Sequence, residues 1–385
     1  MSDTNKQATN EGSSLFPTYA RYPIALVKGE GSWLWDDQGN QYLDFMCGIA
    51  VTNLGHAPKP VKDALVKQLG ELWHVSNLFH IPNQEAAAKL LTDNSHADAV
   101  FFCSTGAEAN EAAIKLARRY QQKVKGNGRY EILTFAQSFH GRTLATLTAT
   151  GQEKVKEGFL PLPEGFRYIP LHDIEALEAA ITDKTAAVMI ETIQAEGGVI
   201  PVDPAYLAHL AKLCKERGVL LIFDEIQTGM GRTGKLFSFE HYGIEPDIFT
   251  LAKGLGSGFP VGAMLAKGEL AEAFPAGSHG STFGGTPIAT AATGEYLVSE
   301  LRAKLGGNPF VKDVRGQGLL VGIACAGPVA PIVAEGQKRG LLVITAGPDV
   351  VRLLPNLLVS REEVDQAVSI LASIFADLTA AAQLT

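Results

Sequence analysis

The sequence predicts an α/β protein built on a mostly parallel central sheet. Short continuous apolar runs alternate with stretches in which apolar residues recur at helical spacing, and this alternation is typical of strands joined by covering helices. Continuous apolar strands indicate burial on both faces of the sheet. The 385 residues, 46% of them hydrophobic, are enough for a large core and two domains.

The expected elements follow in chain order. Residues 31–45 predict a β-hairpin, because apolar residues alternate around a turn at 37–40. The middle of the chain predicts strands at Ala99–Cys103, Tyr130–Phe135, Ala186–Ile190, Val219–Phe223, Ile248–Leu251 and Val261–Leu265. Helices are expected between them at Glu108–Lys125, Ile174–Ile181 and Tyr206–Arg217.

The last part of the chain predicts a smaller α+β domain. Its expected elements are a helix at Thr290–Lys304, strands at Leu319–Cys325, Leu341–Ile344 and Val351–Leu354, and a helix at Glu362–Leu378. We expect a disordered tail (1–14), an N-terminal segment that joins the small domain (15–55), a large domain (56–290) and the small domain (291–385).

The composition excludes several classes of protein. With a net charge of −8 and no long basic run, binding to nucleic acid or an anionic membrane is disfavoured. No apolar run approaches the ~20 residues that span a bilayer, and the N-terminus lacks the apolar region of a secretory signal. The four cysteines are far apart and form no CxxC, so we expect neither a zinc site nor a disulfide framework, and a cytoplasmic location.

Two residues at strand ends indicate a specific chemistry. The run Val219–Phe223 ends in Asp224, and the run that begins at Ile248 ends in Lys253. Ligands of such sheets bind at the carboxyl ends of the strands. The acid can hold a protonated pyridine nitrogen, and the lysine can form a Schiff base with the aldehyde of pyridoxal phosphate. Taken as isolated residues, they are more often a common strand-terminal aspartate and a solvated or capping lysine.

Other strand ends carry residues that fit the same ligand. Ser104–Asn110 follows a strand and opens a helix, so its backbone N–H groups suit a phosphate, although simple helix capping is compatible with the pattern. Phe139 could stack on a planar ring, and Arg142 could hold a carboxylate through two hydrogen bonds. Glu191 and Glu196, after a further strand, could pair with an arginine or lie in a solvated loop.

Two glycine-rich segments are not nucleotide-binding motifs. Gly229–Lys235 matches GxxxxGK, but residue 236 is Leu where a phosphate-binding loop needs Ser or Thr. Gly254-x-Gly256-x-Gly258 precedes Phe259-Pro260 rather than a helix, so it is not a dinucleotide fingerprint.

Taken in order, these motifs resemble the class III (ornithine-type) aminotransferases, in particular those that act on acetylornithine. The matching segments are LDFMCGIAVTNLGHAP (43–58), STGAEAN (104–110), FHGRT (139–143), ETIQAEGG (191–198), DEIQTGMGRTGKLF (224–237), AKGLGSGFPVGA (252–263), HGSTFGGTP (279–287) and VRLLP (351–355). The resemblance covers nearly the whole chain. It implies a pyridoxal 5'-phosphate enzyme of fold type I, with the cofactor on the large domain, and a homodimer with active sites at the subunit interface.

The resemblance also implies roles for cofactor-binding residues. Lys253 is expected to bond the cofactor aldehyde and later to carry a proton, and Asp224 to pair with the pyridine nitrogen. Phe139 is expected to stack on the ring, with Gln227 beside its phenolic oxygen. The phosphate contacts are expected from Gly106 and Ala107, and from Thr282 of the neighbouring subunit.

Substrate-binding roles follow from the same resemblance. Arg352 is expected to hold the α-carboxylate of 2-oxoglutarate or glutamate, and Arg142 that of acetylornithine, with Ser281 nearby. Glu196 resembles a switch that pairs with Arg352 while the ornithine-type substrate is bound and releases it for the oxo acid.

The implied activity is transfer of the δ-amino group of N2-acetylornithine to 2-oxoglutarate in arginine biosynthesis. The alternatives are a related aminotransferase for ornithine, succinylornithine, N-succinyl-diaminopimelate or 4-aminobutyrate, a pyridoxal phosphate aminomutase or racemase, and a non-catalytic binding protein. The presence of Arg352 and Glu196 disfavours the aminomutase or racemase, and that of Lys253 and Asp224 disfavours the binding protein.

Overall fold

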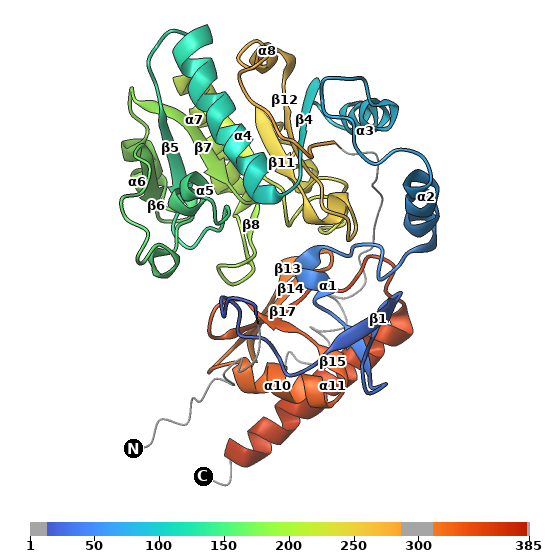
Figure 1. Ribbon diagram of the computed structural model, residues 1–385. Helices are drawn as coiled ribbons and strands as arrows, with labels where there is room; N and C mark the ends of the chain where they lie inside the picture. The colour runs from blue at the N-terminus through green and yellow to red at the C-terminus, as the bar shows by residue number, and fades with distance from the viewer. Residues whose placement is uncertain (1–13, 286–310, 383–385) are drawn as a thin grey trace.

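A computed structural model describes residues 14–285 and 311–382. The chain forms a large layered α/β unit and, beside it, a smaller unit made from both ends of the chain (Figure 1). The predicted helix Thr290–Lys304 and nearly all of the predicted tail lie outside the described residues. Among the described helices, none is long and apolar enough to cross a membrane.

The central sheet is mostly parallel, as predicted. Its strands lie in the order β4-β12-β11-β10-β7-β5-β6. Their bounds are β4 Ala99–Cys103, β12 Gly262–Ala266, β11 Ile248–Leu251, β10 Leu220–Asp224, β7 Thr185–Ile190, β5 Glu131–Phe135 and β6 Phe166–Ile169. β12 runs antiparallel to both of its neighbours, and the remaining pairs are parallel. The edge strand β6 was not predicted, because two adjacent exposed residues, Arg167 and Tyr168, interrupt its apolar run.

Helices cover both faces of this sheet. The main ones are α4 Gly106–Arg119, α5 Leu144–Ala149, α6 Ile174–Ala180 and α7 Pro204–Arg217. In β10, Leu221 and Phe223 pack into the core beneath α7, whereas Ile222 packs into a second core beneath α4. Side chains therefore point alternately to two apolar layers, which explains the continuous apolar runs.

Local sequence sets the beginning of α4. Thr105 caps α4 by accepting a hydrogen bond from the Glu108 backbone N–H at 3.2 Å, and the Glu108 carboxylate accepts one from the Ser104 N–H at 2.9 Å. This reciprocal arrangement satisfies two N–H groups that the helix itself cannot pair. The predicted helix to Lys125 continues from α4 as a π-helical turn, Tyr120–Val124.

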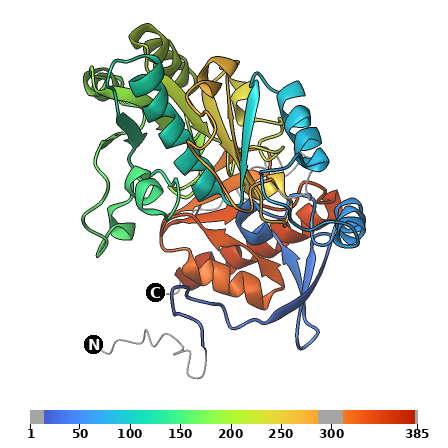
Figure 2. The ribbon, with the colours of Figure 1, turned by 45° about the horizontal axis from the view of Figure 1, so that its top comes forward.

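The small unit joins the two ends of the chain. The predicted hairpin is present as β2 Trp33–Asp36 and β3 Gln41–Asp44, with β1 Leu26–Glu30 at its edge. Strand β3 pairs with β15 Leu341–Leu342, and the N-terminal strands lie beside C-terminal elements in Figure 2. The second sheet has the order β13-β14-β17-β16, with bounds β13 Val311–Gln317, β14 Leu320–Cys325, β17 Val350–Leu353 and β16 Ile344–Thr345.

Two details of the small unit differ from the prediction. The predicted strand Leu341–Ile344 is divided, because β15 pairs with the N-terminal hairpin whereas β16 pairs with β17. Strand β13 was not predicted, since its sequence VKDVRGQ is too polar to read as a buried run. Helices α10 Ala330–Lys338 and α11 Arg361–Ala382 pack on this unit, and α11 contains the predicted last helix.

The remaining elements are short or lie between those already described. They are α1 Cys47–Ala50, α2 Lys59–Leu69, α3 Pro82–Asp93, α8 Gly268–Ala271, the small ribbon of β8 Ile193–Gln194 and β9 Ile200–Pro201, and the 3-10 turns Glu153–Val155, Ser238–His241 and Lys253–Leu255. The short α1 is irregular, since all four of its residues have positive φ angles.

Candidate active site

A cavity of about 410 Å³ lies at the carboxyl ends of β10 and β11, and it gathers most of the predicted site residues. Its lining is Val51, Ser104, Thr105, Gly106, Ala107, Phe139, His140, Gly141, Arg142, Glu191, Asp224, Ile226, Gln227, Ala252, Lys253, Gly258, Phe259, Pro260 and Val261. Because parallel strands end at the same edge of the sheet, the cavity contains residues from segments more than 100 positions apart.

Lys253 begins a 3-10 turn that is separated from β11 by Ala252 alone, and it has a φ of 45°. Burial lowers the pKa of Lys253 to about 8; the nearby Glu196 carboxylate opposes this shift and the Arg352 guanidinium adds to it. A backbone in the left-handed region is strained for a non-glycine residue and is most common at functional sites. The amine is thus nucleophilic at a pH well below that of an ordinary lysine.

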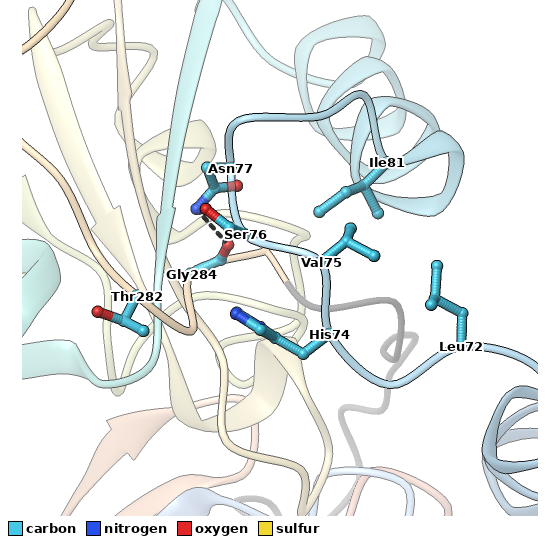
Figure 3. A pocket seen from close by; sticks show the side chains of 8 residues that line it. All are labelled: Leu72, His74, Val75, Ser76, Asn77, Ile81, Thr282 and Gly284. Carbon is cyan, nitrogen blue, oxygen red and sulfur yellow. Dashed lines mark hydrogen bonds between the residues drawn. The ribbon is translucent and has the colours of Figure 1, made fainter.

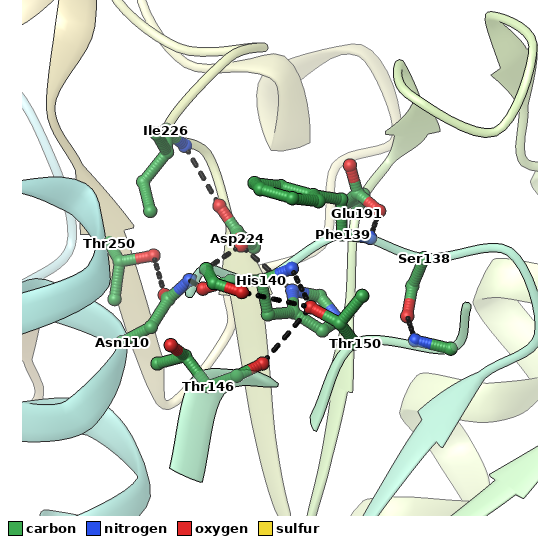
Figure 4. A network of polar contacts seen from close by, with 12 residues as sticks. Asn110, Ser138, Phe139, His140, Thr146, Thr150, Glu191, Asp224, Ile226 and Thr250 are labelled. Carbon is green, nitrogen blue, oxygen red and sulfur yellow. Dashed lines mark hydrogen bonds and ion pairs between the residues drawn. The ribbon is translucent and has the colours of Figure 1, made fainter. Parts of the chain in front are cut away.

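Asp224 ends β10 and is 4% exposed. Its Oδ2 accepts hydrogen bonds from Asn110 Nδ2 and from His140 Nδ1, both at 2.8 Å, and its Oδ1 accepts one from the Ile226 backbone N–H at 3.1 Å. Asn110 is itself held by Thr250, whose hydroxyl donates to Asn110 Oδ1 at 2.8 Å (Figure 4). The carboxylate is therefore fixed in position at the bottom of the cavity before any ligand binds.

The N-terminus of α4 opens into the same cavity, at Thr105, Gly106 and Ala107. First-turn N–H groups have no partner within the helix, and the helix dipole favours an anion there. A Cβ at Gly106 would lie 2.8 Å from Ile226 Cδ1, so a larger residue does not fit without displacing that side chain. This end of the cavity suits a phosphate group.

The walls of the cavity carry an aromatic ring, a cation and a buried acid. The Arg142 guanidinium carbon lies 5.7 Å from the Phe139 ring centroid, and Arg142 is exposed. The Glu191 carboxylate accepts a hydrogen bond from the Phe139 backbone N–H at 3.1 Å. Burial and the nearby negative charge of Asp224 hold the pKa of Glu191 well above its usual value, so its proton is retained to higher pH.

Arg352 and Glu196 form an ion pair beside this cavity. Arg352 is fully buried on β17, and its Nη1 lies 2.6 Å from Glu196 Oε1, 3.1 Å from the Ala195 carbonyl and 3.2 Å from Gln227 Oε1. Burial would raise the pKa of Glu196, but the Arg352 charge and hydrogen bond outweigh it and lower that pKa. Arg352 Nε and Nη2 are buried and have no hydrogen-bond partner among the described residues, so two donors remain for a ligand.

The family model for aminotransferase class-III matches residues 17–305 and 290–375. The chain is 53% identical to the acetylornithine aminotransferase of Halalkalibacterium halodurans, covering 94% of this chain and 98% of that one. It is 51% identical to the acetylornithine aminotransferase of Bacillus subtilis, covering 96% of this chain and all of the relative.

The chain belongs to the class III aminotransferases.

Solved structures of other aminotransferases share its fold. The ornithine aminotransferase of Toxoplasma gondii superposes with a TM-score of 0.90 at 31% identity, over 95% of this chain and 93% of that chain. The N-acetylornithine aminotransferase of Stenotrophomonas maltophilia superposes with a TM-score of 0.77 at 36% identity, over 94% and 98% of the two chains. The fold type predicted from the motifs is thereby confirmed.

Four of the predicted residues do not line the cavity: Glu196 and Arg352 form the ion pair beside it, and Ser281 and Thr282 lie on a separate segment. Ser281 and Thr282 follow Gly280 in a loop that contributes no residue to the lining of the cavity. Thr282 borders a separate small pocket with His74 and Asn77, and the Asn77 side chain donates to the Gly284 carbonyl at 3.1 Å (Figure 3). Asn77 also donates to the Ser281 carbonyl at 3.1 Å. Within a single chain, the structure does not bring Ser281 and Thr282 to the other site residues.

Sequence reasoning missed Asn110, His140 and Thr250, which surround Asp224. Asn110 and His140 lie within the matching segments 104–110 and 139–143, but no role was predicted for either residue from the sequence. Asn110 lies four residues after Gly106 on α4, and that helical spacing places both on the side of the helix that faces the cavity. The spacing was the available signal. Thr250, within an apolar strand, offered none.

Proposed function

We propose that this class III aminotransferase moves the δ-amino group of N2-acetylornithine to 2-oxoglutarate, giving N-acetylglutamate 5-semialdehyde and glutamate, in arginine biosynthesis. The observation that carries the proposal is Arg352, a buried guanidinium that is paired with Glu196 and has two donors without a partner among the described residues, beside the lysine cavity. The choice of acetylornithine is supported by the similar bacterial relatives, which bear that name.

We further propose pyridoxal 5'-phosphate as the cofactor, since the residues present fit it. When bound, it supplies an aldehyde that condenses with amines and a ring that takes up electrons. Lys253 would bond to it and Asp224 would keep its ring nitrogen protonated. Phe139 would stack on the ring, Gln227 would lie beside its phenolic oxygen, and Gly106 and Ala107 would hold its phosphate.

Lys253 and Asp224 then have complementary tasks. With a pKa near 8, Lys253 is partly neutral at physiological pH, so it can act both as a nucleophile and as a carrier of the proton. Asp224 stays fixed because Asn110 and His140 donate to the same carboxylate oxygen. Preorganisation of this kind removes the need to reorient the acid during the reaction.

The two substrates would use different arginines. Arg142, exposed at the cavity wall, would hold the α-carboxylate of acetylornithine. Ser281, which does not line this cavity within one chain, would come near that carboxylate from a second subunit. Arg352 would hold the α-carboxylate of 2-oxoglutarate with its Nε and Nη2 donors. The ion pair with Glu196 would mask Arg352 in the first half-reaction, and Glu196 would release it in the second.

We propose that the enzyme is a cytoplasmic homodimer whose active sites include residues of both subunits. Large apolar side chains are exposed beside the cavity rim, and Trp73 and Phe283 are 71% and 63% exposed. Together with Leu69, Leu72 and Phe259 they line a groove of about 380 Å³. A second copy would cover this surface and would let Thr282 reach the neighbouring cofactor phosphate. Sedimentation of the purified protein tests the dimer, and a monomer at micromolar concentration would contradict it.

The test of the activity is spectroscopic. Purified protein loaded with pyridoxal phosphate should be yellow, acetylornithine should bleach the colour, and 2-oxoglutarate should restore it. Bleaching by ornithine or 4-aminobutyrate but not by acetylornithine would make the enzyme a related ω-aminotransferase. Conversion of the amino donor without any oxo acid would favour an aminomutase or racemase.

A further inference from the structure

The segment Gly229–Lys235, which matches GxxxxGK, contains a buried arginine that the proposed chemistry does not use. Arg232 lies in the loop between β10 and the turn Ser238–His241, and it is 1% exposed. Its Nη1 donates to the carbonyls of Leu319, at 3.1 Å, and Pro355, and its Nη2 donates to Asn53 Oδ1 at 3.3 Å. The Arg232 carbonyl in turn accepts the Leu319 N–H at 2.9 Å. One side chain thus joins the large unit to three separate segments of the small one.

Arg232 makes no ion pair with any residue in the described ranges 14–285 and 311–382. Burial lowers the pKa of Arg232, while the nearby Cys47 and Asp44 oppose that shift. A buried guanidinium without a carboxylate partner is costly unless several carbonyl groups accept its protons. An apolar residue at this position would avoid the desolvation cost, but it would lose the fixed geometry of the guanidinium donors. We therefore attribute the role of Arg232 to that geometry.

Asn53 also lies between this loop and the chain that follows Lys253. Asn53 Nδ2 donates to the Met230 carbonyl at 2.8 Å, and a Cβ at Gly254 would lie 2.0 Å from that nitrogen. The Asn53 carbonyl accepts the Leu357 N–H at 2.6 Å. Arg232 and Asn53 therefore connect the segment after Lys253 with the segment after β17, which begins two residues beyond Arg352.

This connection becomes important when Arg352 changes partner. In the present arrangement Arg352 is tied directly to the large unit through Glu196, Ala195 and Gln227. If Glu196 releases Arg352 to bind an oxo acid, much of this direct contact is lost at the moment when Arg352 must keep its distance from Lys253. The other crossing arginine, Arg315, donates to the carbonyls of Gly198 and Val199, which belong to the loop that carries Glu196.

We propose that Arg232 is a positioning residue that holds the β17 segment, and with it Arg352, at a fixed distance from Lys253 while Glu196 is disengaged. The inference rests on the proposed switch between two half-reactions. It predicts that Arg232 matters more for the oxo acid than for the amino donor, which a general loss of stability would not produce.

The test compares Arg232→Met with Arg118→Met in the holoenzyme. Arg118 is a matched control because its guanidinium also donates to three backbone carbonyls, those of Tyr130, Glu164 and Gly165, all within the large unit. Stopped-flow half-reactions should show that Arg232→Met raises the apparent dissociation constant of 2-oxoglutarate about tenfold or more and that of acetylornithine less than about threefold. Arg118→Met should leave the ratio of the two constants unchanged.

Hydrogen–deuterium exchange supplies a readout that does not depend on activity. Peptides covering 318–325 and 350–358 should exchange faster in Arg232→Met than in Arg118→Met. Equal losses in both half-reactions, or unchanged exchange in these peptides, would overturn the proposal.

If Arg232→Met does not fold, Arg232→Lys, which retains the charge but not the fork of donors, takes its place with the same expectations. If the wild type fails to react with acetylornithine, the proposed function is wrong, whereas exchange and the 2-oxoglutarate constant, measured with whichever donor the wild type accepts, still test Arg232.

Discussion

The lowered pKa of Lys253 predicts an unusual pH dependence for its reaction with an aldehyde. With a pKa of about 8, roughly a quarter of the amine is neutral at about pH 7.5, against about one part in a thousand for an ordinary lysine. Because only the neutral amine attacks, Lys253 should react with pyridoxal phosphate roughly 200-fold faster at that pH than its ordinary pKa would allow. The rate should rise with pH and level off above about pH 8 to 9.

The assay follows covalent attachment to cofactor-free protein. Samples mixed with pyridoxal phosphate across a pH series are quenched with borohydride at short times, and mass spectrometry measures labelling of the Lys253 peptide. Lys212, whose side chain is 72% exposed, serves as the internal reference for the reagent in the same samples. A midpoint at or above about pH 10 for Lys253 would refute the argument that burial governs its charge.

Two further consequences have defined signs. The Glu196 carboxylate raises the pKa of Lys253, so Glu196→Gln should move the midpoint to lower pH. The pKa of Lys253 is about 8 in the folded protein and about 10.4 in the unfolded chain. Below pH 8, burial of the protonated amine therefore lowers the free energy of unfolding by about 3 kcal/mol. This loss of stability disappears as the pH rises from about 8 to about 10.4, so Lys253 makes the cofactor-free protein more stable with increasing pH between these two values.

Three other substitutions test the site. Lys253→Ala should reduce turnover at least about a thousandfold and abolish borohydride-dependent labelling; transamination at the wild-type rate would contradict the whole scheme. Asn110→Ala removes a 2.8 Å hydrogen bond to buried Asp224 and should weaken pyridoxal phosphate binding about tenfold in equilibrium dialysis, and an unchanged affinity would show that the bond does not position the acid. Gly106→Ala should weaken cofactor binding because its Cβ meets Ile226, and Ile226→Val should restore part of the affinity; no rescue would mean that the clash is not the cause.

Local sequence patterns predicted much of the fold. The central strands β10 and β11 are continuous apolar runs, and such runs reveal burial on both faces without knowledge of any partner. Edge strands were missed where charged residues interrupt the pattern, as in β6 and β13. The division of Leu341–Ile344 between two sheets could not be predicted either, because it depends on which distant strand each half pairs with.

Sequence patterns alone predicted that Asp224 and Lys253 lie at one edge of a sheet, because the carboxyl ends of parallel strands share an edge. The motif resemblance added the chemistry expected of them. Three properties are visible only in the folded chain: the ion pair between Arg352 and Glu196, the lowered pKa of Lys253, and the connection that Arg232 makes between the two units. These properties depend on desolvation and on contacts between residues more than 80 positions apart, and neither leaves a trace in the local periodicity of a chain.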